Sequence, residues 1–381
     1  SAETTSLARA WEASGPRQFW SVELGEGYAG AAIANGRVYV MDYDHQKRQD
    51  ALRCLSLADG KEIWRYAYPV PVKRNHGMSR TVPAVHAGMV VAMGPKCHVV
   101  CLDANSGELR WGLDLARDFG ATVPPWYAGQ CPLIDNGRVI LGVGGKDALM
   151  LAVDCASGKV VWQTPNPKGW KMTHSSVIPM EFGGRRMYVY CASLGVVGVS
   201  ATDGSLLWET PDWKISIAMI PSPVILEEGR IFLSGGYNAG SLMLQLKQEG
   251  DRLVPQTAFK LEPEVFGATQ QTPIYHAGHL FGVRPDGQLV CLDSTGKVRW
   301  GSGSGNTFGM GPFLIASGLI FAINDAGSLT LIEASSDKFS KLANARVLNG
   351  RESWGPLALA GGRLIARDFT RMVCLDVASK L

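Results

Sequence analysis

Six tryptophans recur along this chain of 381 residues at a nearly constant spacing. They are Trp20, Trp64, Trp111, Trp162, Trp208 and Trp300, and the intervals between them are 44, 47, 51, 46 and 92 residues. The last interval equals two periods of 46 residues, with one tryptophan absent between them. A period of this length is typical of propellers and other repeat arrays, whose units cannot bury their apolar faces alone. The sequence therefore predicts a repeat fold.

Each repeat carries two landmarks that predict strands and turns. The first is a small residue or proline, followed after five or six residues by a glycine and a β-rich run, as in Pro132-Leu-Ile-Asp-Asn-Gly-Arg-Val-Ile. It predicts two strands joined by a tight turn. It begins at eight places: Ala31, Pro83, Pro132, Val177, Pro223, Pro273, Pro312 and Pro356. The second landmark is Leu-Asp-x-x-x-Gly-x-x-x-Trp, as in the segment 102–111, and predicts a turn between a third and a fourth strand.

Four strands in each of eight repeats predict an all-β, eight-bladed β-propeller with four-stranded antiparallel blades. The last repeat stops at residues 374–381, before its fourth strand, whereas residues 17–24 read as a fourth strand with no blade before them. We expect this N-terminal strand to complete the last blade and so to close the array, which removes open sheet edges. The predicted organisation is an N-terminal lead-in at 1–16 and one propeller at 17–381.

Composition excludes several other classes of protein. The net charge of +3 gives no reason to expect nucleic acid as a partner, and no apolar run is long enough for a transmembrane segment. Four of the eight cysteines, Cys54, Cys101, Cys291 and Cys374, occupy one equivalent repeat position. Equivalent positions in different blades are too far apart for disulfides, so we interpret these cysteines as small buried hydrophobic residues.

The motif Asp-x-x-x-Gly-x-x-x-Trp, repeated around a ring, resembles the repeat of pyrroloquinoline-quinone (PQQ) dehydrogenases and their non-enzymatic relatives. The similarity covers residues 17–381. Those relatives include secreted PQQ-like propeller proteins and the propeller lipoprotein of the outer-membrane barrel-assembly machinery. The resemblance implies a periplasmic or secreted protein whose export signal has been removed, consistent with a first residue that is not methionine. Because the motif serves packing, it specifies the fold and not the activity.

The loops that connect one blade to the next carry most of the unusual side chains. They are long, aromatic and basic at residues 66–80, and aromatic again at 124–127, 168–174, 212–214 and 351–354. Aromatic planes and cations suit a sugar, an anionic small molecule or a peptide. The alternative is that these loops fold over their own apolar side chains. The candidate ligand-binding residues, on these loops and lining the expected channel, are Tyr28, Arg74, His76, Arg80, Trp126, Tyr127, Gln130, Trp170, His174, Trp213, Gln270, Gln271 and Trp354.

Three functions are compatible with this pattern. The favoured one is a non-catalytic binding or interaction module of the bacterial cell envelope, with a protein or carbohydrate partner and no catalytic residue. The resemblance also allows a PQQ-dependent dehydrogenase, which requires a quinone cofactor, calcium and a carboxylate base. No expected channel position is Asp or Glu and there is no Cys-Cys pair, so no cofactor is predicted. The third is a polysaccharide lyase or hydrolase that uses Arg80, Tyr127 and His174.

The sequence also offers only weak metal sites. The seven histidines show no metal-binding pattern, and His276 and His279 flank a predicted turn as solvated residues. Asp42 and Asp44 lie in one loop and could hold calcium, but a solvated loop is the preferred interpretation. No metal site is predicted.

Overall fold

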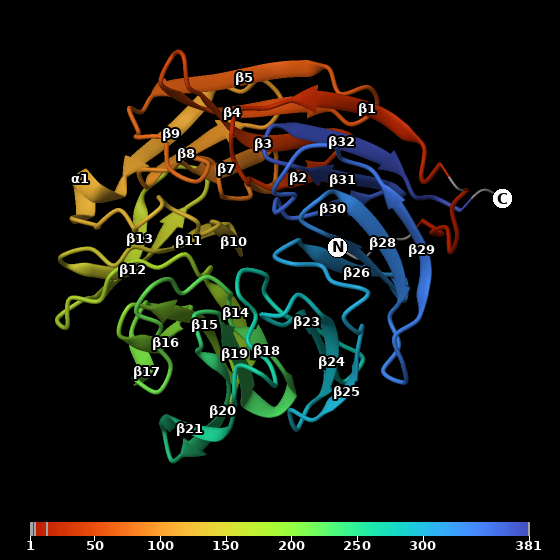
Figure 1. Ribbon diagram of the computed structural model, residues 1–381. Helices are drawn as coiled ribbons and strands as arrows, with labels where there is room; N and C mark the ends of the chain where they lie inside the picture. Colours follow the sequence, from red (N-terminus) through yellow and green to blue (C-terminus); the bar gives the residue numbers. More distant parts are fainter. Residues whose placement is uncertain (1–2, 4, 13, 380–381) are drawn as a thin grey trace. The chain divides into compact units, whose positions relative to one another are not determined.

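The computed structural model describes residues 3, 5–12 and 14–379. Within these residues the strands form eight four-stranded antiparallel sheets, which are the blades of an eight-bladed β-propeller (Figure 1). Seven blades contain four strands in chain order, and in the eighth β1 (Gln18–Glu23) lies beside β32 (Arg371–Asp376). The predicted fold class and the predicted place of the N-terminal strand are both confirmed.

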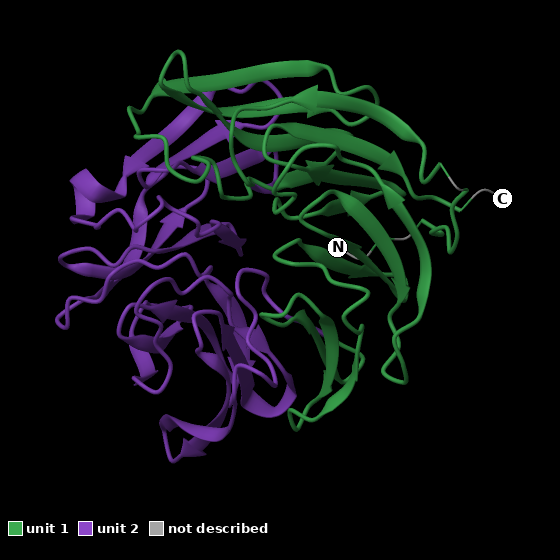
Figure 2. Ribbon diagram, viewed as in Figure 1, with its two compact units in different colours: residues 1–83, 276–381 green, residues 84–275 purple. Residues whose placement is uncertain are grey.

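The chain divides into two compact units, residues 1–83 with 276–381, and residues 84–275 (Figure 2). The first unit contains blade 8 (β1, β30 Ala358–Ala360, β31 Arg363–Arg367, β32), blade 1 (β2 Ala31–Ala34, β3 Arg37–Asp44, β4 Gln49–Ser56, β5 Glu62–Pro69), blade 7 (β26 Phe313–Ala316, β27 Leu319–Ile323, β28 Ser328–Glu333, β29 Lys341–Arg346) and most of blade 6 (β22 Ile274–His276, β23 His279–Val283, β24 Leu289–Asp293, β25 Val298–Gly301).

The second unit contains blades 2 to 5. Their strands are β6 (Ala84–His86), β7 (Met89–Met93), β8 (His98–Asp103), β9 (Leu109–Asp114); β10 (Leu133–Asp135), β11 (Arg138–Gly142), β12 (Ala148–Asp154), β13 (Val160–Pro165); β14 (Ile178–Phe182), β15 (Arg185–Ala192), β16 (Gly195–Ser200), β17 (Leu206–Thr210); and β18 (Val224–Ile225), β19 (Arg230–Gly235), β20 (Gly240–Glu249), β21 (Arg252–Leu261). A short helix, α1 (Leu115–Phe119), follows β9, and a 3₁₀ turn, η1 (Glu227–Gly229), precedes β19. No described helix is long and apolar enough to cross a membrane.

The first landmark of the repeat is a hairpin turn whose two central residues both have positive φ. This holds in every blade, at residues 35–36, 87–88, 136–137, 183–184, 228–229, 277–278, 317–318 and 361–362. Two successive positive φ values define a type I′ turn, whose twist matches that of the flanking strands. The second residue is glycine in all eight turns, because glycine adopts this conformation without steric cost.

The second landmark joins neighbouring blades. At four ladder tryptophans the indole Nε1 donates a hydrogen bond to a backbone carbonyl in the turn between the third and fourth strands of the following blade, as from Trp111 to Cys155 (2.8 Å) and from Trp162 to Ala201 (3.3 Å). The indole of Trp208 instead donates to the Met187 sulfur in its own blade. At Trp111 the motif glycine of the following blade's turn lies against the indole ring. A Cβ added at Gly158 would lie 2.6 Å from Cγ of Trp111. The motif is thus a packing device between blades.

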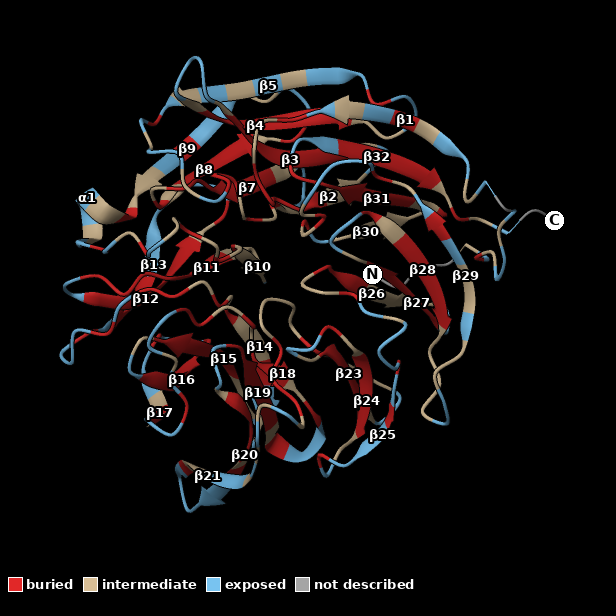
Figure 3. Ribbon diagram, viewed as in Figure 1, coloured by how far each residue is buried: buried red, intermediate tan, exposed pale blue. Residues whose placement is uncertain are grey.

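Most of the core lies between neighbouring blades. Figure 3 shows that the middle strands of the blades are buried whereas the outer strands are exposed, and β4 and β5 illustrate the contrast. Buried clusters join blades 2 and 3, blades 3 and 4, and blades 4 and 5 in the second unit, and blades 7 and 8 in the first. Leu7 of the lead-in belongs to the last of these clusters and pairs with Ala378 in an isolated β-bridge.

Candidate functional site

The candidate residues from the sequence are distributed over both units. The first unit holds Tyr28, Arg74, His76, Arg80 and Trp354, and the second holds Trp126, Tyr127, Gln130, Trp170, His174, Trp213, Gln270 and Gln271. Each unit therefore has its own set of neighbouring groups.

In the first unit, Tyr28 is the centre of an aromatic–cation cluster. Its ring centroid lies 5.1 Å from that of Trp354 and 5.5 Å from that of Phe369, and the Arg80 guanidinium lies 5.4 Å above it. These distances are typical of favourable aromatic and cation–π contacts. Tyr28, Arg80 and Trp354 come from the loops before blades 1, 2 and 8, so the structure brings three predicted residues together.

Two carboxylates that the sequence interpretation missed hold this cluster in place. The Tyr28 hydroxyl donates to Glu352 (2.7 Å), and the Trp354 indole nitrogen donates to Asp325 (2.8 Å). Burial, and then the hydrogen bond to Glu352, raise the pKa of Tyr28 well above its ordinary value. In the sequence, Glu352 lies two residues before Trp354 in the charged loop 351–354, and this closeness was the signal that could have identified Glu352. Tyr28 is only 7% exposed, so its ring packs inside the cluster and is hardly accessible to a ligand.

A buried arginine donates hydrogen bonds to the backbone of the loops next to this cluster. Arg367 is 2% exposed, and its guanidinium donates to the backbone carbonyls of Gly25 (3.2 Å), Ala29 (3.3 Å) and Phe369 (3.0 Å). Burial lowers its pKa to about 10. Arg367 thereby ties β31 of blade 8 to the loop that carries Tyr28.

The basic candidate residues of the first unit lie on the loop 66–80, and two of them form polar contacts with neighbouring groups. Arg74 forms an ion pair with Glu26, whose carboxylate is also 3.5 Å from His45. Arg80 donates to the backbone carbonyl of His76 (2.6 Å). His76 is exposed and has a φ of 43°, which is unusual for a residue other than glycine.

In the second unit, the loop Pro124–Tyr127 has a strained backbone. Trp126 and Tyr127 have φ values of 59° and 71°, a left-handed conformation that costs roughly 1–2 kcal/mol per residue. His174 lies against this loop: its Nε2 is 2.8 Å from the Pro125 carbonyl oxygen, and its ring centroid is 6.5 Å from that of Trp126. Trp126, Tyr127 and His174 therefore form one half-buried group between blades 3 and 4.

The other candidates of the second unit are less accessible. Trp170 and Trp213 are each 5% exposed and pack in the cores of blades 3–4 and 4–5, so the alternative of loops folded over their own side chains applies to them. Gln130 is fully buried; its Oε1 accepts from the Gly142 amide (2.8 Å) while its Nε2 has no partner. Gln270 and Gln271 are half-buried.

Three exposed apolar side chains on neighbouring loops of blades 4 and 5, called the apolar patch below, were not predicted. Among the described residues, nine large apolar side chains are exposed, and six of them precede a ladder tryptophan on a fourth strand: Ile63, Leu109, Val160, Val161, Leu206 and Val298. The other three are Leu194 (43% exposed), Ile217 (51%) and Tyr237 (45%). They lie in the hairpin between β15 and β16, the loop between β17 and β18, and the hairpin between β19 and β20.

The three patch residues belong to loops that contact one another. A Cβ added at Gly195, beside Leu194, would lie 2.1 Å from the Thr210 carbonyl oxygen, where the loop with Ile217 begins. A Cβ added at Gly235, near Tyr237, would lie 2.1 Å from Cδ1 of Ile215 in the same loop. Tyr237 itself has a φ of 57°, so the turn holds an exposed aromatic ring in a costly conformation.

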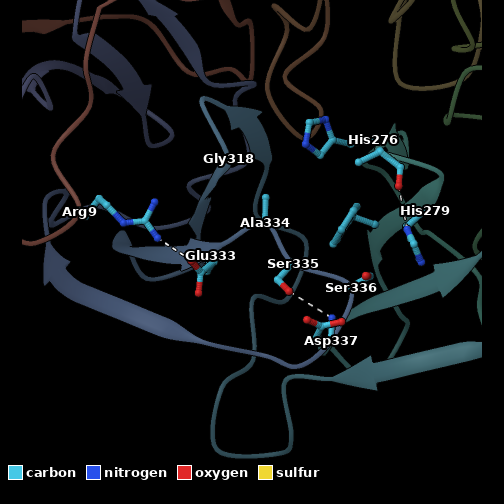
Figure 4. Close-up of a pocket in the computed structure, with 11 residues that line it drawn as sticks. Arg9, His276, His279, Gly318, Glu333, Ala334, Ser335, Ser336 and Asp337 are labelled. Atoms are coloured by element: carbon cyan, nitrogen blue, oxygen red, sulfur yellow. Dashed lines mark hydrogen bonds and ion pairs between the residues drawn. The ribbon is translucent and has the colours of Figure 1, made fainter.

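A shallow cavity of about 580 Å³ lies elsewhere in the first unit (Figure 4). It is lined by the turn from His276 to His279, by Gly318 and by the segment 333–337. Arg9 of the lead-in also lines it and forms a 2.6 Å ion pair with Glu333. His279 Nδ1 is 2.9 Å from the Ala277 carbonyl oxygen. The two histidines, expected as solvated turn residues, line this open cavity.

Carboxylates in the described segments do not gather into a metal site. No group of three or more His, Cys, Asp or Glu side chains is placed to hold a metal ion in the part of the chain that the structure describes. Asp42 accepts from Arg53 (3.0 Å) and from the Gly25 amide, whereas Asp44 accepts from the Lys47 amide (2.9 Å). The two carboxylates that suggested a calcium loop are therefore used separately for local hydrogen bonds.

Comparison with known proteins identifies the family. A family model described as outer membrane protein assembly factor BamB matches residues 48–302. The chain belongs to this family. A BamB of Yersinia pestis is 21% identical over 355 residues, which cover 88% of this chain and 79% of that protein. The crystal structure of BamB from Moraxella catarrhalis covers 94% of this chain and 99% of its own, with a TM-score of 0.64 and 14% identity.

The chain also resembles part of a quinone-dependent enzyme. The 1-butanol dehydrogenase (quinone) of Thauera butanivorans is 31% identical over 142 residues. The match covers 33% of this chain and 22% of that enzyme, so the chain spans about a fifth of its length. The likeness therefore concerns the propeller repeat and extends over a minor part of the enzyme.

Proposed function

We propose that this chain is a non-catalytic protein-interaction propeller of the bacterial cell envelope, located in the periplasm or secreted. The observation that carries the proposal is the apolar patch of Leu194, Ile217 and Tyr237. Six of the nine exposed apolar residues lie one or two residues before a ladder tryptophan, which explains them as part of the outer strand. The patch residues have no such explanation, and clustered exposed apolar side chains mark protein interaction sites.

The chemistry of the patch favours a protein partner. Aromatic and aliphatic side chains at the centre of a surface, surrounded by polar groups, form the anchors of interfaces. Exposed Lys171, Asp212 and Lys214 lie in the segments next to the patch and provide such a rim. The family's description as an assembly factor agrees with a partner-binding role.

Capture from an envelope extract tests this function. The variant Leu194→Ser/Ile217→Ser/Tyr237→Ser removes the apolar side chains, whereas Leu109→Ser/Val160→Ser/Leu206→Ser removes equally exposed residues from the outer strands of the same unit. We expect the wild-type chain and the outer-strand variant to retain the same cross-linked envelope protein, and the patch variant to lose it. Retention by both variants would refute the assignment, provided that both have wild-type circular dichroism and melting temperatures.

A PQQ-dependent dehydrogenase is the second candidate, supported by the 31% identity to part of a butanol dehydrogenase. The groups present do not fit this cofactor. Glu352 and Asp325 accept hydrogen bonds from the Tyr28 hydroxyl and the Trp354 indole, and Trp354 and Phe369 pack against Tyr28, so the Tyr28 ring offers no open face to a flat quinone. Titration with PQQ and calcium tests it: quinone absorbance that co-elutes with the chain, together with reduction of a dye by alcohols, would favour the enzyme.

A further inference from the structure

At four ladder tryptophans whose indole donates to a carbonyl of the next blade, the junction places one further pair of residues together. The first member lies opposite the tryptophan on the third strand, and the second supplies the carbonyl that accepts the indole hydrogen bond. The pairs are Cys374 and Leu57 at Trp20, Cys101 and Cys155 at Trp111, Ala152 and Ala201 at Trp162, and Cys291 and Ser335 at Trp300. Among these junctions, only the one between blades 2 and 3 places two cysteines together.

The side chain of Cys101 contacts Cys155. The sulfur of Cys101 lies 3.6 Å from the Cys155 carbonyl oxygen, and the two residues are 0% and 1% exposed. Interaction with the Cys155 side chain, and then burial, raise the pKa of Cys101. Both backbones are fixed, because Cys101 pairs with Trp111 across the sheet and Trp111 holds the Cys155 carbonyl at 2.8 Å.

We propose that Cys101 and Cys155 form a disulfide when the chain folds under oxidising conditions, linking blade 2 to blade 3 inside their shared core. The earlier interpretation of Cys101 as a small hydrophobic residue holds for the reduced chain, and its distance argument concerned equivalent repeat positions only. Cys155 occupies a different position, in the turn after the third strand. A crosslink between residues 54 apart closes a long loop of the unfolded chain and so stabilises the folded one.

The oxidation is a thiol–disulfide exchange. The thiolate of one cysteine attacks a sulfur of an external disulfide, either a small molecule or an oxidoreductase, and forms a mixed disulfide with release of one thiol. The second cysteine attacks this intermediate and expels the second thiol. Both cysteines lose a proton, and the external disulfide takes up the two electrons as two thiols. Because the folded junction excludes the oxidant, the exchange takes place before blade 3 has packed on blade 2.

Refolding in a glutathione redox buffer tests the proposal on the full chain. The reduced chain is unfolded in denaturant, refolded with reduced and oxidised glutathione, quenched in acid, and labelled with a maleimide in denaturant. Of the eight cysteines, we expect six to be labelled, and mass spectrometry of the digest to show one linked pair that contains Cys101 and Cys155. The oxidised chain should also unfold at higher denaturant concentration than the reduced chain.

Two variants separate this disulfide from general oxidation. Cys155→Ser reproduces the Cys291/Ser335 pair of blades 6 and 7, so it should fold, label at all seven remaining cysteines and lose the difference between oxidised and reduced unfolding midpoints. Cys291→Ser should keep the Cys101–Cys155 link. Labelling of all eight cysteines in the refolded wild-type chain, or a linked pair at other positions, would overturn the proposal.

Discussion

Two glycines of blade 3 allow backbone strain and steric packing to be measured separately. Gly137 and Gly158 have nearly the same φ, 73° and 72°. A Cβ added at Gly137 meets nothing within 4 Å, whereas a Cβ added at Gly158 would lie 2.6 Å from Cγ of Trp111. Replacement of either glycine by alanine imposes the left-handed strain, but only Gly158→Ala also displaces the indole.

The expected costs follow from these two terms. Gly137→Ala should lower the free energy of unfolding by about 1–2 kcal/mol, the cost of a left-handed conformation for a residue with a Cβ. Gly158→Ala should lose the same amount plus roughly 1–3 kcal/mol for overpacking, because Trp111 is buried and held by the Cys155 carbonyl. Urea denaturation followed by far-UV circular dichroism gives both midpoints and slopes. Equal losses in the two variants would refute the idea that the motif glycine is required for contact with the ladder tryptophan.

Three further results are expected. Burial raises the pKa of the fully buried Asp50 to about 7 from 3.8, so the folded chain binds a proton that the unfolded chain releases. The free energy of unfolding should therefore fall by up to about 4 kcal/mol as the pH rises from 4 to 8. In Asp50→Asn the free energy of unfolding measured in urea should depend less on pH, and the same pH dependence as in the wild type would contradict this. A double-mutant cycle with Tyr28→Phe and Glu352→Gln should give a coupling of about 1–3 kcal/mol in the free energy of unfolding, and additive losses would show that their 2.7 Å hydrogen bond contributes nothing. Arg367→Met leaves several backbone carbonyls without a donor and should lower the free energy of unfolding by about 3 kcal/mol, whereas Arg74→Met, at an exposed ion pair, should cost much less. Equal losses in thermal or urea unfolding would contradict the supporting role of Arg367.

The repeat made the fold predictable, because its two landmarks are determined locally. The glycine of the hairpin turn recurs in every blade, and an indole eight or nine residues after a leucine or valine recurs in most of them, so the hairpins and the place of β1 could be derived from spacing. The loops between blades have no such period. Trp170 and Trp126 looked alike in sequence, yet Trp170 is buried because Asn166 accepts a hydrogen bond from its amide (2.9 Å) and folds the loop inward.

The candidate site was only partly predictable for a related reason. Tyr28 and Arg80 were found because they occupy equivalent expected channel positions of neighbouring blades, and Trp354 because it occupies the next position, whereas Glu352 and Asp325 lie off those positions. The apolar patch depends on three loops that are brought together only by the packing of blades 4 and 5. Leu194 and Ile217 are ordinary residues in sequence, and their exposure is a property of the folded chain.

The pairing of β1 with β32 has a consequence for biosynthesis. Gln18 lies opposite Leu375, so β1 has its partner strand more than 350 residues later in the chain. At ordinary rates of translation this strand waits roughly 20 to 70 s with an open hydrogen-bonding edge. A newly made chain therefore needs protection by a chaperone, or rapid export, during the interval in which the other blades can already fold.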